Sequence, residues 1–222
     1  MWIENFLNNR DQPRLVIFAG AGISAESGVP TFRDADGLWH GHDIDKVCNL
    51  KHFMENYELT HKFYNERRVA LNNVKPNSAH QQCMDWLNKY GPDRVVIITT
   101  NVDDLFEQCA HDPSHKVMHV HGNLTHMIFS YRDQGENCVD IGKVSHDHTP
   151  LSLKNILTEP GVVFFNEAMR YEDGVKKPLY QDMDFVLKSL NYNDTAIVVG
   201  SSNTVVQFAE ELSVTPAHTF NV

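Results

Sequence analysis

A glycine-rich loop directly after an apolar run is the segment of this chain best suited to bind a phosphorylated ligand. The run Leu15–Ala19 leads into Gly20-Ala21-Gly22, and Gly28 and a Phe32-Arg33 pair follow. A buried strand that passes through glycines into a helix presents free N–H groups, which suit the pyrophosphate of a dinucleotide. The third glycine comes later than in the common G-x-G-x-x-G fingerprint, so the loop predicts a dinucleotide site of a less common type.

Amide and carboxylate side chains follow a second apolar run. Asn101 and Asp103 come directly after a strand expected over 94–99. In open α/β sheets, ligands bind at the carboxyl ends of the strands, which makes both residues candidates for ligand contacts. Alternatively they cap the next helix, and the two roles can apply to different residues.

Two histidines alternate in His119-Val120-His121-Gly122 at the end of a third expected strand. The period of 2 places both imidazoles on one face of the strand. Imidazole titrates near neutral pH, and a following glycine leaves room for a substrate, so His121 is a candidate general base. The alternative for either ring is a structural histidine satisfied within the core.

A tyrosine and an arginine lie three residues apart in the helical pattern of residues 34–75. Tyr64 and Arg67 therefore share a helix face. A guanidinium binds carboxylates through two hydrogen bonds, so this pair is suited to an acidic ligand group. The alternative is a packed tyrosine beside a solvated arginine.

The histidines and cysteines do not predict a metal site. Seven of the thirteen histidines lie between positions 111 and 148, but Cys138, His146 and His148 have no zinc-ligand spacing. The four cysteines are scattered and are expected to be reduced thiols.

Composition restricts the class of protein. The chain has 222 residues, a net charge of −10 and 41% apolar residues, as expected for a globular protein with no general affinity for nucleic acid or anionic membranes. It has no apolar run approaching the ~20 residues of a membrane helix. The N-terminal residues lack the pattern of a signal peptide, so we expect a cytoplasmic protein.

Short runs rich in valine and isoleucine separate helical stretches, which favours an α/β fold with a Rossmann-like doubly wound parallel sheet. We expect one domain over residues 1–222, with insertions at 34–75 and 123–160 forming a smaller lobe. A helix carrying Cys83 is expected to begin with a capping box formed by Ser78 and Gln81. The expected strands cover Leu15–Ala19, Arg94–Thr99, Val117–Val120, Gly161–Phe165 and Thr195–Val199.

Taken together and in order, these motifs resemble the signature segments of sirtuins, the NAD-dependent protein deacylases. The matching segments are Gly20–Arg33, Thr99-Thr100-Asn101-Val102-Asp103, His121-Gly122, Val162–Glu167 and Gly200-Ser201-Ser202. The resemblance implies acyl transfer from a protein lysine to the ADP-ribose of NAD, with release of nicotinamide, with His121 as base and with Asn101 as the second catalytic residue. By the same resemblance the cofactor is NAD and its contacts are Gly20, Ala21, Gly22, Ser24, Ala25, Phe32, Arg33, Thr100, Asn101, Asp103, Gly200, Ser201, Ser202 and Asn221.

The segment Phe63–Arg68, together with Thr31, resembles the sirtuin branch that removes succinyl, malonyl or glutaryl groups as well as acetyl groups. In that branch the tyrosine and arginine bind the acyl carboxylate, which assigns Tyr64 and Arg67 to the substrate. The acylated lysine peptide is expected to contact Val163, Phe165 and Glu167.

The chain departs from the family pattern at several positions. Thr100 stands where sirtuins usually have glutamine, Asn166 replaces a glycine, and residues 123–160 lack the paired zinc cysteines. Asn221 is the residue expected to reach the adenosine end. These departures leave an alternative open, an NAD glycohydrolase or ADP-ribosyltransferase of sirtuin fold, and also a nucleotide-binding sensor with little turnover.

Overall fold

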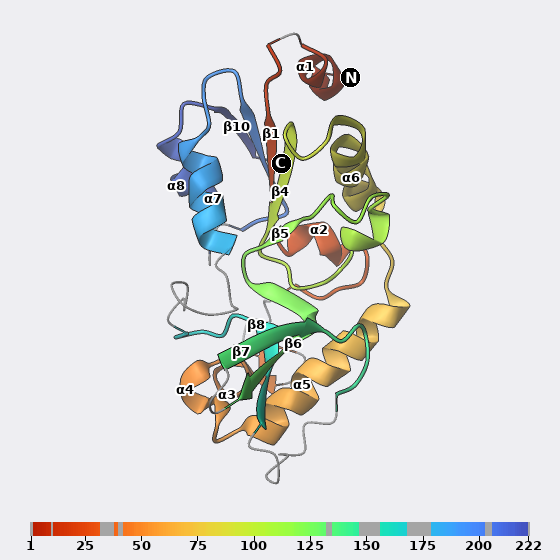
Figure 1. The fold of residues 1–222 in the computed structure, drawn as a ribbon, viewed down its shortest axis with the longest axis vertical. Helices are drawn as coiled ribbons and strands as arrows, with labels where there is room; N and C mark the ends of the chain where they lie inside the picture. The colour runs from red at the N-terminus through yellow and green to blue at the C-terminus, as the bar shows by residue number, and fades with distance from the viewer. Residues whose placement is uncertain are drawn as a thin grey trace.

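A five-stranded parallel sheet and a separate antiparallel lobe make up the protein (Figure 1). The computed structural model describes residues 2–9, 11–31, 38–39, 42–131, 135–146, 156–167, 179–202 and 206–221. In Figure 1 the parallel sheet occupies the upper half and the smaller lobe the lower half, with α2 near the boundary between them.

The order of the parallel sheet is that of a Rossmann-like fold. Its strands, in the order β10-β9-β1-β4-β5, have the bounds β10 His218–Asn221, β9 Thr195–Val199, β1 Leu15–Ala19, β4 Val95–Thr99 and β5 Met118–His119. The chain proceeds from β1 outward to β4 and β5, then returns to the other side of β1 for β9 and β10. The sheet order therefore reverses between β1 and β9, the point at which such folds bind ligands.

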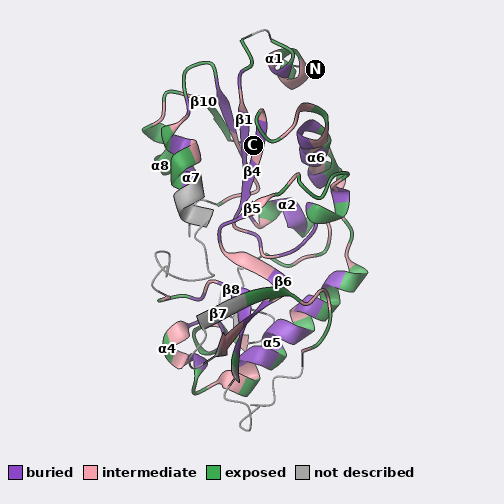
Figure 2. Ribbon diagram, viewed as in Figure 1, coloured by how far each residue is buried: buried purple, intermediate pink, exposed green. Residues whose placement is uncertain are grey.

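The central strand β1 is buried along its whole length. It pairs in parallel with β4 on one side, where Leu15 faces Val95, and with β9 on the other, where Leu15 faces Thr195. Both faces of the strand are covered by helices, which explains its continuous apolar sequence. Figure 2 shows β1 and β4 as the buried centre of the molecule.

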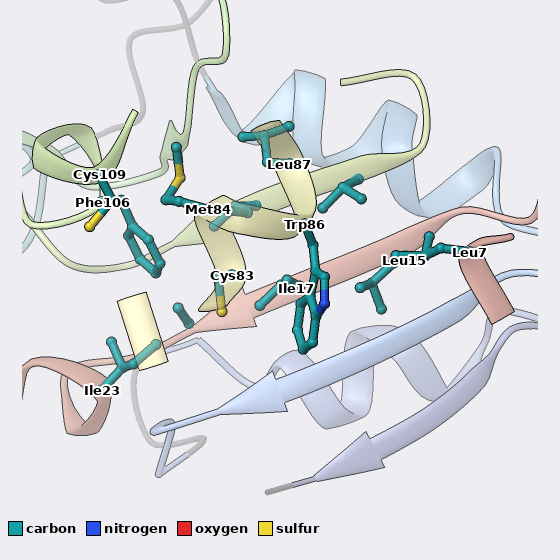
Figure 3. Close-up of a cluster of buried hydrophobic side chains, with 13 residues drawn as sticks. Leu7, Leu15, Ile17, Ile23, Cys83, Met84, Trp86, Leu87, Phe106 and Cys109 are labelled. Carbon is teal, nitrogen blue, oxygen red and sulfur yellow. The ribbon is translucent and has the colours of Figure 1, made fainter. Parts of the chain in front are cut away.

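Helices cover the two faces of the sheet. On one face α1 (Trp2–Leu7) and α6 (Ser78–Tyr90) pack against Leu15 and Ile17, with Met84 and Leu87 of α6 fully buried (Figure 3). On the other face α7 (Leu179–Lys188) and α8 (Phe208–Ser213) enclose the opposite side of β1. The period of 2 along β1 thus divides its side chains between two apolar cores.

The smaller lobe joins helices to an antiparallel sheet of order β7-β6-β8. Its elements are β2 Leu38–Trp39, β3 His42–Asp43, α3 Ile44–Val47, α4 Leu50–Phe53, α5 Tyr57–Ala70, η1 Leu71–Asn73, β6 Gly122–Tyr131, β7 Gly135–Asp140 and β8 Ile156–Val162. The remaining elements, α2 Gly22–Ala25 and η2 Glu107–Cys109, lie in the loops after β1 and β4.

The expected α/β class, with a Rossmann-like sheet and an inserted lobe, is confirmed. The strand expected over Gly161–Phe165 is wrong, because β8 ends at Val162 and pairs antiparallel with β6 of the small lobe. The expected capping box is also wrong by one residue: Asn77 is the N-cap of α6, and its partner is His80. The boundaries of a single domain over 1–222 stay a prediction.

The cysteines are free thiols, with Cys48, Cys83 and Cys109 buried and Cys138 exposed. Among the described residues, no helix is long and apolar enough to cross a membrane.

Candidate nucleotide and acyl-group site

Two glycine loops meet at the carboxyl ends of β1 and β9. The amide of Gly20 donates to the carbonyl oxygen of Val199 at 2.9 Å, and that of Gly22 donates to Gly200 at 2.7 Å. A Cβ atom on Gly20 would lie 2.7 Å from the carbonyl oxygen of Gly200, which itself has a φ of +62°. The glycines are therefore needed for the contact between the loops, which places both loops at the reversal point of the sheet.

The residues expected to contact the cofactor around the reversal point of the sheet differ in exposure. Ala21 and Ser201 are half-buried, whereas Gly22, Ala25 and Ser202 are exposed. The predicted contacts Phe32 and Arg33 lie outside the described residues. Asn221 pairs with Val198 at the carboxyl end of β10, on the same edge of the sheet as Gly200.

The Ser24 hydroxyl is the centre of a buried hydrogen-bond network. It donates to Asp103 Oδ2 at 3.0 Å and accepts from Asn101 Nδ2 at 3.0 Å. Its single proton goes to the acceptor-only carboxylate, so His80 Nε2, at 3.2 Å, donates to Ser24. The hydroxyl thereby uses its one donor and both of its acceptor positions.

His80 is neutral in this network. Burial lowers its pKa to about 4. Its Nδ1 atom lies 3.4 Å from the backbone amide of Asn77 and accepts from it, which completes the cap of α6. The same imidazole therefore fixes the beginning of α6 and orients Ser24.

Asn101 and Asp103 face this network from the loop after β4. Burial raises the pKa of Asp103, and the hydrogen bonds from the Leu105 amide and the Ser24 hydroxyl oppose that shift. The Asn101 side chain is buried, and its Oδ1 atom has no hydrogen-bond partner in the described structure. A buried amide oxygen of this kind is an acceptor for a donor supplied by a ligand.

Both histidines of the His119-Val120-His121 segment contact carbonyl groups of this loop. His121 Nδ1 lies 3.2 Å from the carbonyl oxygen of Thr100, and His119 Nδ1 lies 2.7 Å from that of Asn101. A carbonyl oxygen only accepts, so each Nδ1 carries a proton. In His121 this leaves Nε2 as the basic nitrogen, and burial lowers the pKa of the ring.

Gly122 has a structural role that differs from the expected one. Its φ is +80°, and a Cβ atom there would overlap the carbonyl oxygen of Gly161 on the neighbouring strand β8. The glycine allows β6 to begin directly after His121 while it packs closely against β8. This close packing requires a glycine at position 122, and room for a substrate does not.

The segment after β8 connects His121 to the small lobe. The amide of Val163 donates to the carbonyl oxygen of His121 at 2.9 Å. Phe165 is paired through its amide with Cys48 and through its carbonyl with Leu50, while its side chain is 41% exposed. Glu167 accepts a hydrogen bond from the Phe164 amide at 2.8 Å, and this closes the turn.

Asn166 lies in that turn with a φ of +57°. This left-handed conformation favours glycine, and asparagine is among the residues that tolerate it. The backbone therefore keeps a glycine-like turn despite the substitution.

Tyr64 and Arg67 lie together on α5, and they share a third neighbour. The Tyr64 hydroxyl is hydrogen-bonded to the Cys48 thiol, and burial raises the pKa of both groups, that of Cys48 to about 11. Arg67 Nη1 donates to the carbonyl oxygen of Phe63 at 2.8 Å, and its guanidinium carbon lies 3.3 Å from the centre of the Phe63 ring. Burial lowers the Arg67 pKa to about 10, so the side chain remains a cation at neutral pH.

The structure brings these two regions together through residues 162–165. Val163 contacts His121, and the Phe164 ring lies 5.7 Å from the Tyr64 ring. The small lobe is also attached to the loop after β4, because Lys143 Nζ forms a 2.7 Å ion pair with Asp104. His121, the candidate base, thus lies on one side of residues 162–165. Tyr64 and Arg67, the candidates for binding an acidic acyl group, lie on the other side.

Three functional candidates were not identified as such from sequence. His80 contacts Ser24 of the network, His119 contacts the loop that carries it, and Glu107 contacts His119. The alternation of His119 with His121 was a signal for the second, but Glu107 on η2 gave none. Within the described residues, no group of three or more histidines, cysteines or carboxylates is placed to hold a metal ion.

Comparison with known proteins defines the class. The model of the Sir2 family matches residues 20–207. The chain therefore belongs to the Sir2 family.

Individual relatives agree with this assignment. An NAD-dependent protein deacylase of Helicobacter hepaticus is 36% identical over 90% of this chain and 79% of its own length. The NAD-dependent protein deacylase SIR2rp3 of Trypanosoma brucei brucei is 34% identical over 94% of this chain and 81% of its own length. A solved Sir2 homologue–NAD complex superposes with a TM-score of 0.73 at 28% identity, covering 99% of this chain and 80% of that one.

Proposed function

We propose that this protein is an NAD-dependent protein-lysine deacylase that transfers the acyl group to ADP-ribose and releases nicotinamide. The observation that carries the proposal is the position of His121: its Nδ1 donates to the Thr100 carbonyl, so the ring lies beside the loop that holds Asn101 and Asp103, and Nε2 is its basic nitrogen. The relatives named above are NAD-dependent protein deacylases, and this indicates the cofactor and the reaction.

The residues of the site fit a nicotinamide dinucleotide. The buried Asn101 Oδ1 lacks a partner and would accept from the ribose or the carboxamide. Gly20, Gly22, Gly200 and Ser201 would hold the phosphates at the reversal point of the sheet, with Ala21, Ser24, Ala25, Thr100, Ser202 and Asn221 as further contacts.

When bound, the dinucleotide supplies the ribose carbon to which the acyl oxygen adds as nicotinamide leaves. His121 Nε2 would accept the proton of a ribose hydroxyl, so that the oxygen could attack the acyl carbon. Asn101 is held for this purpose by its bond to Ser24. Val163, Phe165 and Glu167 would contact the acylated peptide.

We assign the acyl group to a short dicarboxylic class, such as succinyl or malonyl. The Arg67 cation is half-buried and lies beside the Tyr64 hydroxyl, and a partly desolvated cation favours a carboxylate over a neutral acetyl methyl group. The Arg67 guanidinium is stacked on Phe63, which limits its orientations and lowers the entropic cost of binding.

One assay tests both levels of the proposal. The protein is incubated with NAD and with succinylated, acetylated or unmodified forms of one peptide, while nicotinamide and peptide mass are followed. Nicotinamide release that requires an acylated peptide and matches its loss of acyl mass supports deacylation, and faster loss of succinyl supports the acidic preference. Release of equal rate without acylated peptide identifies an NAD glycohydrolase instead.

A further inference from the structure

His119 is held between two acceptors at the edge of the parallel sheet. Its Nδ1 lies 2.7 Å from the Asn101 carbonyl oxygen and its Nε2 lies 2.8 Å from Glu107 Oε1. The side chain is 7% exposed, while that of Glu107 is 40% exposed. A buried imidazole that faces a carbonyl with one nitrogen and a carboxylate with the other satisfies both only when both nitrogens carry protons.

We infer that His119 is a positioning residue for the dinucleotide: as an imidazolium paired with Glu107, it fixes the Asn101 backbone and with it the loop 100–103. This inference rests on the proposed NAD site, because the loop it fixes is the one assigned to the nicotinamide end.

The backbone of the loop is held at two consecutive carbonyl groups. His121 holds that of Thr100 and His119 that of Asn101, while the Asn101 side chain bonds to Ser24. Two contacts therefore orient the Asn101 Oδ1 atom, which has no partner in the described structure. They are the hydrogen bond from His119 to the Asn101 backbone and the bond from the Asn101 side chain to Ser24. If Nε2 lost its proton, its lone pair would face the Glu107 carboxylate and the bond between them would be lost.

The groups that face the His119 ring come from three elements. Glu107 lies on η2, Asp103 lies in the loop after β4 and His126 lies on β6. Burial alone would lower the His119 pKa, but Glu107, with smaller contributions from the Asn101 carbonyl and Asp103, outweighs it and the net shift is upward. Burial lowers the pKa of His126, so that ring is neutral at pH 7 and adds no opposing charge.

The sign of the pH dependence follows from the raised pKa. The His119 ring is protonated below the ordinary histidine pKa of ~6.5, and it stays protonated above that value until the pH passes through the raised pKa. NAD affinity should therefore be constant below the raised pKa of His119 and fall as the pH passes through it. In Glu107→Gln the His119 pKa drops, so the same fall should begin at lower pH.

The first measurement is of the charge itself. Ring-nitrogen NMR of protein labelled at histidine with ¹⁵N, assigned with His119→Asn, should show both His119 nitrogens protonated at pH 7 in the wild type. A neutral His119 ring at pH 7 overturns the inference, whatever the protein binds.

The second measurement is of NAD binding by calorimetry between pH 6.5 and 9. We expect Glu107→Gln to bind NAD about tenfold more weakly at pH 7.5, the loss expected for a hydrogen bond to a charged group. Its KM for NAD should rise while kcat at saturating NAD changes little. The control is His111→Asn, an exposed histidine on the same loop, which should bind as the wild type does.

Identical pH profiles for NAD binding in the wild type and Glu107→Gln would overturn the inference and leave the proposed function standing. A wild type that binds no NAD at any pH would contradict the proposed function, and the role of His119 in that site with it.

Discussion

His121 Nδ1 and the carbonyl oxygen of Thr100 lie 3.2 Å apart, and this contact fixes the tautomer of the candidate base. Because the carbonyl accepts, Nδ1 keeps its proton and Nε2 carries the lone pair. The contact joins β4 to the segment after β5, so the orientation of the base depends on the same loop that carries Asn101 and Asp103.

Replacing His121 with alanine should abolish deacylation and leave the fold intact. The imidazole contributes general-base catalysis, whose loss typically costs on the order of 10²–10⁴-fold in rate. Steady-state turnover, with circular dichroism as the check on folding, measures the effect. Turnover near that of the wild type would contradict the assignment of the base.

The acid side of the pH profile should also report His121. Burial lowers its pKa, so the ring stays neutral, and therefore basic, to a pH below the ordinary value of ~6.5. The rate kcat/KM should rise with pH through a value below 6.5 and then become flat. An acid limb centred above 6.5 would be inconsistent with a buried, neutral base.

Ser24→Ala should weaken both the fold and NAD binding. The substitution removes the one hydroxyl that Asp103, Asn101 and His80 share, and a buried polar group left without its partner costs ~1–3 kcal/mol of unfolding free energy. Urea unfolding and calorimetry with NAD measure the two effects. The matched control is Ser27→Ala, because the buried Ser27 hydroxyl has no partner among the described residues and its removal should cost little.

Arg67→Met should separate the two acyl substrates. Loss of a charged hydrogen bond to the acyl carboxylate is worth ~1.5–3 kcal/mol, so desuccinylation should fall at least tenfold more than deacetylation. The comparison is the ratio of kcat/KM for succinyl and acetyl forms of one peptide, with the exposed Lys62→Met on the same helix as control. Equal losses on both substrates would refute the carboxylate contact.

Asp194→Ala should destabilise the end of the sheet remote from the site. Asp194 is 1% exposed and accepts from the backbone and guanidinium of Arg14, whose Nη2 lies 2.7 Å away. Leaving the Arg14 charge without its carboxylate should cost ~3 kcal/mol of unfolding free energy. Asp184→Ala, which removes an exposed ion pair with Lys188, should cost under ~1 kcal/mol. A similar loss in both variants would contradict the difference in burial.

Sequence reasoning was most successful where local pattern and burial coincide. β1 was predicted with its observed bounds because a strand buried on both faces needs an unbroken apolar run. It was least successful for β8, which begins at Ile156 instead of Gly161 and pairs with β6 through an irregular register. The cap of α6 was displaced by one residue because asparagine and serine are both good N-caps and only the backbone conformation selects between them.

The sequence by itself determined four of the five strands of the parallel sheet, the glycine loop and the residue types of the candidate site: Ser24, Asn101, Asp103 and His121, with Tyr64 and Arg67 on one helix face. Only the tertiary structure decided how these groups are paired. It placed His80 on Ser24, Glu107 on His119 and Cys48 on Tyr64, across separations that no local period encodes. The physical reason is that periodicity fixes the side of an element on which a side chain lies, whereas the partner it meets depends on how distant elements pack.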